Sequence, residues 1–211
     1  MSIIPVGSLV IDALLGPPIE GDTTDEAILG ATLHCLSRHG LERMTVADVA
    51  AEAGVGRATV FRRFETKDEL IRRAFAWDLG RLANQFRAAT ESIEDPIERA
   101  AEWIVQAVHV VRTHPVARRL VEDDAALPIL RDPQITQMLL GAVGHELENT
   151  ANQAGIEFDT EMMAEVIVRF FGSVWLTPDL GAATGDDAGV RRLARTILAS
   201  LTVPPAAVDE H

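Results

Sequence analysis

The stretch that decides the fold is TVADVAAEAGVGRATVFRRFETKDEL, which runs from Thr45 to Leu70. Thr45 and Asp48 have the spacing of a helix-capping box, with Asp in place of the usual Glu. The helix that they open has apolar residues at positions i, i+3, i+4 and i+7, which form one inward face: Val46, Val49, Ala50 and Ala53. This pattern predicts a short helix with one side packed against the rest of the protein.

A tight turn, Ala53-Gly54-Val55-Gly56, separates this helix from a second one at about Arg57–Phe64. Glycine suits a sharp turn because it tolerates positive φ. In the second helix Val60 and Phe64 lie one turn apart on the inward face. Two short helices joined in this way predict a helix-turn-helix, whose second helix enters the major groove of DNA.

Charge is distributed unevenly along the chain. The sequence has 19 Lys and Arg against 32 Asp and Glu, a formal net charge of −13, which excludes a generally basic coat for nucleic acid. Within residues 57–67 four basic residues oppose the single acidic Glu65, a net of +3, whereas residues 81–211 hold 11 basic and 20 acidic residues, a net of −9. The positive patch therefore lies on the predicted recognition helix, although a solvated helix face also explains four basic residues.

The whole chain is predicted to be all-α, with about nine helices. Strand patterns are rare and there is no Tyr. Helix starts are indicated by Thr23 with Glu26, by Thr66 with Glu69, and by Asp followed by Pro at 95–96 and 132–133. The expected helices span residues 23–39, 45–53, 57–64, 66–89, 96–113, 115–124, 133–154, 160–176 and 188–201.

These elements predict an N-terminal arm (1–22), a helix-turn-helix DNA-binding domain (23–78), a helical ligand-binding and dimerisation domain (79–203) and a C-terminal tail (204–211). The arm is apolar but too short to span a membrane, and no basic residue precedes Arg38, so it is no secretory signal. It is either a mobile tail or a segment that docks on the body through four apolar residues: Leu9, Val10, Leu14 and Leu15.

Over residues 24–75 the sequence resembles the TetR family of transcriptional regulators. The motifs that carry this resemblance together are Ala27-Ile28-Leu29, His39-Gly40, Thr45-Val46-Ala47-Asp48-Val49-Ala50, Ala53-Gly54-Val55, Thr59-Val60-Phe61-Arg62-Arg63-Phe64 and Lys67-Asp68-Glu69-Leu70. The resemblance implies an all-α homodimer with a three-helix DNA-binding domain, and a regulatory domain whose last two long helices form a four-helix bundle with the partner.

The resemblance and the charge pattern together give the expected DNA-binding residues: Thr45, Arg57, Ala58, Thr59, Phe61, Arg62, Arg63 and Lys67. The family implies that Thr45 caps its helix beside a phosphate and that Lys67 holds a phosphate. Phe61 stands where the family usually has Tyr, so a phosphate contact from a hydroxyl is lost there. Gly56 stands where Ser or Thr often caps the recognition helix, which predicts a looser first turn.

The helix predicted at residues 160–176 has two apolar stripes, so it requires burial on two sides. One stripe and the apolar face of the last helix fit the dimer interface that the family implies. The expected interface residues are Met163, Val166, Ile167, Phe170, Val174, Val190, Leu193, Ile197 and Leu201.

A pocket for a small-molecule effector is expected in the larger domain. Its candidate lining residues are large or polar side chains on the central helices: Trp103, His109, Met138, Phe171 and Trp175. For each of them taken alone, a structural role such as core packing is the simpler explanation. Few Lys or Arg fall on the inner faces, which favours an apolar effector that is neutral or cationic over a phosphorylated one.

Other classes of protein fit the sequence poorly. No nucleotide-binding loop or Gly-x-Ser-x-Gly elbow occurs, and the Cys35–His39 and His109–His114 pairs lack further matched ligands, so no enzyme, cofactor or metal site is predicted. The single cysteine fits a reducing, cytoplasmic setting.

The predicted function is a ligand-released repressor that binds a palindromic operator as a homodimer. The alternative is a helical ligand-binding or interaction module with weak or lost DNA binding.

Overall fold

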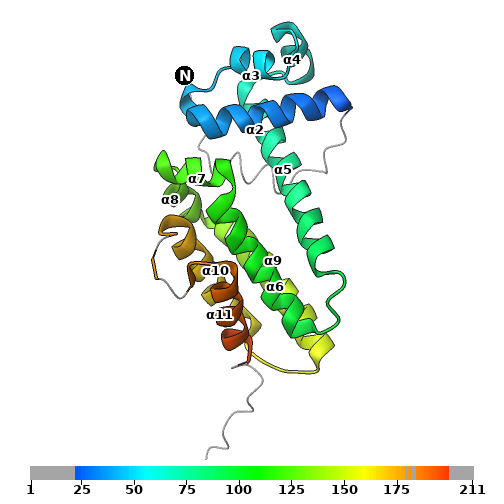
Figure 1. Ribbon diagram of the computed structural model, residues 1–211, viewed down its shortest axis with the longest axis vertical. Coiled ribbons are helices and arrows are strands. Elements are labelled where there is room, and N and C mark those ends of the chain that lie inside the picture. Colours follow the sequence, from blue (N-terminus) through cyan, green and yellow to red (C-terminus); the bar gives the residue numbers. More distant parts are fainter. Residues whose placement is uncertain (1–21, 179, 182–183, 200–211) are drawn as a thin grey trace, which may run out of the picture. The chain divides into compact units, whose positions relative to one another are not determined.

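The computed structural model describes residues 22–178, 180, 181 and 184–199. Within these residues all regular secondary structure is helical, which confirms the predicted all-α class (Figure 1). The helices are α2 (Thr23–Arg43), α3 (Val46–Glu52), α4 (Arg57–Arg63), α5 (Lys67–Thr90), α6 (Pro96–Thr113), α7 (Pro115–Glu122), α8 (Ala126–Leu130), α9 (Pro133–Ala154), α10 (Thr160–Leu176) and α11 (Asp187–Ala199).

These ten helices are one more than expected, because α8 was not predicted. It has only five residues, with Pro128 in the middle, so its sequence indicates a loop. Proline is tolerated there because the first-turn amides of a helix have no intrahelical acceptor. The predicted arm, the C-terminal tail and Leu201 lie outside the described residues.

Side-chain caps position most of the helix starts where the sequence places them. The Thr45–Asp48 capping box is formed in both directions, and Asp159 accepts from the backbone N–H of Met162. The predicted box of Thr23 with Glu26 is wrong, since α2 is capped by Asp22, whose side chain accepts from two backbone N–H groups. Asp and Thr both favour the cap position, and the local sequence does not say which of the two takes it.

The described chain packs as two compact units. The first contains residues 22–87 and 110–138, and the second contains residues 88–109 and 139–199. Three long helices, α5, α6 and α9, pass from one unit into the other. No helix in the described part of the chain has the length and hydropathy that a membrane-spanning helix requires.

In the first unit α2, α3 and α4 share one hydrophobic core. Its most deeply buried side chains come from α2, from the helix-turn-helix and from the start of α5: Ile28, Leu29, Leu36, Met44, Val49, Val60, Phe64, Leu70 and Ile71. Val60 and Phe64 are each 1% exposed, as their spacing predicts. Burial of this set fixes which side of α4 faces solvent.

Gly40 is the point at which α2 meets α7 in the first unit. The helix was predicted to end there, and the chain indeed kinks at this residue (φ 74°) before a last turn that ends at Arg43. A Cβ at this position would lie 2.0 Å from Oδ2 of Asp123, a carboxylate that receives two hydrogen bonds from Arg119 on α7. Only glycine therefore combines the left-handed backbone with this close approach.

In the second unit α6, α9, α10 and α11 surround a core of small and aliphatic residues. The buried members are Ala100, Ala101, Leu147, Ala164, Ile167, Ala194 and Leu198. Alanines at facing positions allow the helices to pack closely, with larger residues such as Ile104 and Leu140 closing the edges. This core buries one side of the helix predicted at residues 96–113.

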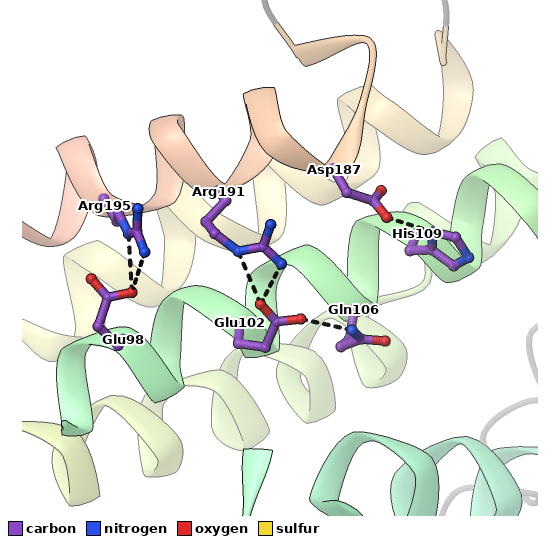
Figure 2. Close-up of polar contacts among 7 residues, drawn as sticks. All are labelled: Glu98, Glu102, Gln106, His109, Asp187, Arg191 and Arg195. Carbon is purple, nitrogen blue, oxygen red and sulfur yellow. Dashed lines mark hydrogen bonds and ion pairs between the residues drawn. The ribbon is translucent and has the colours of Figure 1, made fainter. Parts of the chain in front are cut away.

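A ladder of polar contacts joins α6 to α11 along the side of this core (Figure 2). Glu98 accepts two hydrogen bonds from Arg195, Glu102 accepts two from Arg191, and His109 contacts Asp187 at 3.0 Å. On α11 the partners are four residues apart, or about one helical turn; on α6 Glu98 and Glu102 are one turn apart and His109 lies two turns further on, so the contacts follow each other along two antiparallel helices. The ladder sets the register of α11 on α6.

Replacing Gly40 with alanine should destabilise the protein more than the same change at Gly54. Gly54 also has positive φ (66°), but a Cβ there meets nothing within 4 Å, so Gly54→Ala should cost only the left-handed strain, about 1 to 2 kcal/mol. Gly40→Ala adds displacement of Asp123 from Arg119. Urea unfolding followed by circular dichroism measures both variants, and equal losses would show that the Asp123 contact is unimportant.

Glu102→Ala should lower the free energy of unfolding by about 1 to 3 kcal/mol, because it leaves a partly buried Arg191 without its charged acceptor. The side chains of Glu98 and Arg195 are 41% and 52% exposed, so Glu98→Ala should lower the free energy of unfolding by clearly less. Urea denaturation of the two variants side by side checks the order. A larger loss for Glu98→Ala would contradict it.

Candidate nucleic-acid interface

The solvent-facing side of α4 carries the side chains expected to read DNA. Arg57, Ala58, Phe61 and Arg62 are all exposed, and Thr59 is partly buried at the edge of this surface. Residues spaced by four lie on the same side of a helix, so Arg57 and Phe61 are neighbours, as are Ala58 and Arg62. We call these four exposed residues the recognition face. It contains two cations and no acidic residue.

Phe61 is 40% exposed, and the Arg57 guanidinium lies 5.4 Å from the centre of its ring. This cation–π contact holds the Arg57 side chain along the helix, and the guanidinium keeps its positive charge. The Phe61 ring presents a flat apolar surface beside two cations.

The two helices of the helix-turn-helix begin differently, as the sequence predicts. The Thr45 hydroxyl donates to Oδ2 of Asp48 at 2.7 Å, and together with the Thr45 amide it holds the pKa of that carboxyl below its usual value. Gly56 is the N-cap of α4, with no side chain to accept from the first turn. The expected absence of a side-chain cap on the recognition helix is therefore confirmed.

Arg63 occupies a different environment from Arg62. Its side chain is 26% exposed, and Nη1 donates to both carboxylate oxygens of Asp22 at 2.9 Å and to Asp25 at 2.7 Å. Its hydrogen bonds to Asp25 and Asp22 raise the pKa of the Arg63 guanidinium, and hydrogen bonds from the Asp25 backbone N–H and from Arg63 lower the pKa of Asp22. Arg63 thus belongs to an ion-pair cluster with the start of α2 rather than to the recognition face.

Lys67, the first residue of α5, points to the end of α2. Its Nζ donates to the carbonyl oxygens of Leu41 at 2.7 Å and Glu42 at 3.4 Å. A lysine near unpaired carbonyls at a helix end is stabilising for the same reason as a C-cap. The ammonium group has three donors, so two backbone contacts leave capacity for one more acceptor.

The candidate pocket residues are divided between the two units. Trp103 and His109 on α6 and Phe171 and Trp175 on α10 belong to the second unit, whereas Met138 belongs to the first. Trp175 is 8% exposed and lies in the core, while Trp103 is 37% exposed. His109, expected as a polar anchor for a ligand, contacts Asp187 in the ladder.

The second unit has an open surface crevice of about 410 Å³ that the sequence does not indicate. It lies where α9 ends and α10 begins. Two carboxylates and one aromatic ring are among its lining residues: Glu148, Glu157 and Phe158. None of the candidate pocket residues lines it.

The expected dimer residues also differ in exposure. Val190, Val174 and Ile167 are at most 9% exposed within the single chain, so they pack in the core of their own subunit. Val166 is 43% exposed and its neighbour one turn earlier, Met162, is 65% exposed. Met163, Phe170, Leu193 and Ile197 are partly buried.

Sequence reasoning missed the acidic partners of Arg63. In the sequence, Asp22 is the last residue of the predicted arm and Asp25 lies at the start of the helix predicted at residues 23–39. The two contacts with Arg63 span 38 and 41 residues. No local spacing indicates them, because each depends on how α4 packs against α2.

Comparison with known proteins identifies the helix-turn-helix. The family model described as "Bacterial regulatory proteins, tetR family" matches residues 28–74. An uncharacterised HTH-type transcriptional regulator of Mycobacterium tuberculosis is 37% identical over 81 residues, which cover 38% of this chain and 39% of that protein. The match therefore spans about two fifths of the length of this relative.

Two further matches extend over most of the chain. The DNA-binding transcriptional repressor TetR of Mycobacteroides abscessus is 26% identical over 200 residues, covering 88% of this chain and 97% of that one. The solved structure of the regulator FadR from Bacillus subtilis, in complex with stearoyl-CoA, has a TM-score of 0.60 at 18% identity and covers 83% of this chain and 96% of that one. The helix-turn-helix, residues 28–74, thus matches the tetR family of bacterial regulatory proteins, and over most of its length the chain is similar to one repressor of that kind and shares the fold of FadR.

Proposed function

We propose that the protein is a transcriptional repressor that binds a palindromic operator as a homodimer and is released by a small molecule. The observation that carries this proposal is the recognition face of α4, where Arg57 and Arg62 are exposed on a chain with a formal net charge of −13. A local cationic surface on an anionic protein restricts phosphate attraction to this helix. The match of residues 28–74 to a family of regulatory proteins supports the same function and agrees with the prediction that the chain is no enzyme.

The geometry of α4 suits readout in the major groove. Ala58 is small, so the helix approaches the base edges closely, and Arg62 one turn later reaches a guanine with two parallel hydrogen bonds. Phe61 packs against a sugar, Thr59 and Thr45 lie at the edges of the contact, and Lys67 uses its remaining donor on a phosphate. We assign DNA binding to residues 23–78.

One recognition helix reads only a few base pairs, so two copies are needed for a specific site. A two-fold dimer reads two half-sites about 34 Å apart, and a change in the separation of the two heads weakens both contacts together. We assign dimerisation and effector binding to residues 79–203. The exposed pair Met162 and Val166 on α10 is an apolar strip that a partner subunit would bury.

The proposed effector is apolar and neutral or cationic. The aliphatic core of the second unit, and a crevice with Glu148 and Glu157 beside Phe158, support this chemistry. FadR from Bacillus subtilis holds stearoyl-CoA, whose acyl chain is apolar but whose phosphates would be repelled by carboxylates such as these. An effector that prefers the DNA-free state by about 1.4 kcal/mol shifts the equilibrium tenfold.

Arg62→Ala should lower the affinity for a specific duplex by about five- to 150-fold, the equivalent of about 1 to 3 kcal/mol for one base contact. The duplex is first selected by the wild-type protein from a random library, and affinity is then measured by gel-shift titration at fixed salt. Arg118→Ala is the matched control, since it removes the same charge from an exposed position on α7. Failure of the wild-type protein to select any duplex would support the alternative of a module without DNA binding.

Val166→Glu should weaken dimerisation, because it places a charge in the apolar strip next to Met162. Native mass spectrometry of the wild-type protein should show twice the subunit mass of 22.9 kDa, and the variant should shift toward single subunits. The same spectra report any small molecule that copurifies. Gln137→Glu adds the same charge to an exposed position on α9 and should remain dimeric. A wild-type protein that binds its duplex as a single subunit would contradict the proposed dimer.

A further inference from the structure

We propose that Arg63 does not bind DNA but is a positioning residue, whose ion-pair cluster with Asp22 and Asp25 fixes the rotation of the recognition helix. The inference rests on the proposed function, since it concerns how α4 is presented to a duplex. It separates two adjacent arginines that the sequence treats alike. Arg62 reads the operator, and Arg63 holds α4 on the start of α2.

The first support is the geometry of the cluster. One nitrogen of Arg63, Nη1, serves three carboxylate oxygens at 2.7 to 2.9 Å. Asp22 is at the same time the N-cap of α2 and accepts from the backbone N–H groups of Thr24 and Asp25. The cluster is therefore connected to the backbone of α2 through the Asp22 side chain, and does not end on a side chain that has no other contact.

The second support is the balance of charge and burial. Two carboxylates surround one guanidinium, so the cluster has a net charge of −1 and offers no attraction to a phosphate. The Asp25 side chain is 15% exposed. If Arg63 turned toward DNA, it would leave this partly buried carboxylate without its cation and next to a second anion. The raised pKa of Arg63 and the lowered pKa of Asp22 agree with an ionised pair between these two side chains.

The third support is that the other contacts of α4 do not fix its rotation about the helix axis. Val60 and Phe64 hold the helix by apolar burial, which selects the side that packs inward but resists rotation about the helix axis only weakly. Hydrogen bonds from Arg63 are directional and fix that rotation. Ala58 and Arg62 lie on the side of α4 opposite to Val60 and Phe64. A small rotation of the helix about its axis would therefore carry both side chains away from the base edges.

The first test needs no DNA. Hydrogen exchange of the α4 backbone amides, followed by mass spectrometry or NMR, is compared among the wild-type protein, Arg63→Gln and Arg62→Gln. Arg63→Gln should speed exchange across Arg57–Arg63, whereas Arg62→Gln, the neighbouring exposed arginine, should leave it unchanged. Unchanged exchange in Arg63→Gln would overturn the proposal whatever the protein does with DNA.

The second test measures affinity for the selected duplex against salt concentration. Each phosphate contact adds about 0.9 to the slope of log K against log salt, so an arginine that binds phosphate lowers the slope when it is removed. Arg63→Gln should reduce affinity several-fold at every salt concentration and keep the wild-type slope. A slope lowered by about 0.9 would identify Arg63 as a phosphate contact and overturn the proposal.

The third test uses the acidic partner. If Asp25 merely restrained a DNA-binding arginine, Asp25→Asn would release Arg63 and raise affinity; under the proposal it loosens α4 and lowers affinity. Glu26→Gln is the matched control, because it removes one negative charge from an exposed position in the same turn. Affinity of Asp25→Asn several-fold below that of Glu26→Gln supports the positioning role, and equal or higher affinity overturns it. A wild-type protein that selects no duplex instead removes the proposed function, and the exchange experiment still decides the role of Arg63.

Discussion

The recognition surface depends on the burial of two side chains, Val60 and Phe64, beneath α4. Each is 1% exposed, and together they turn Arg57, Ala58, Phe61 and Arg62 outward. Apolar burial is strong but not directional, so it selects the face of the helix without fixing its exact rotation. The ion pairs of Arg63 with Asp22 and Asp25 supply the directional part, and hydrophobic and polar forces therefore have separate tasks in one short helix.

The same division of tasks recurs in the second unit. Small and aliphatic side chains bring α6, α9, α10 and α11 together, and the ladder of charged contacts sets the register of α11 on α6 (Figure 2). A core built largely from alanine has little shape of its own to prevent sliding. Charged partners spaced one turn apart penalise a shift of the register, because every rung breaks at once.

The strongly acidic composition is compatible with DNA binding because the positive charge is local. Four of the basic residues fall within residues 57–67, but the structure uses them differently. Arg57 and Arg62 face solvent, Arg63 is neutralised by two carboxylates, and Lys67 donates to the carbonyl oxygens of Leu41 and Glu42. The electrostatic footprint of the recognition face is therefore smaller than a count of charges indicates, which raises the importance of correct placement for the two exposed arginines.

The sequence alone determined the helical class, most helix boundaries, the Thr45–Asp48 box and the inward face of α4, because caps, turns and apolar periodicity act over a few residues. Only the tertiary structure decided the partners of Arg63, the contact of Gly40 with Asp123 and the ladder between α6 and α11, whose pairs are 78 to 97 residues apart. It also showed that Asp22 rather than Thr23 caps α2, and that a five-residue helix precedes α9. Long-range contacts leave no local pattern, since they arise only when separate helices pack and bring distant charges within a few ångströms.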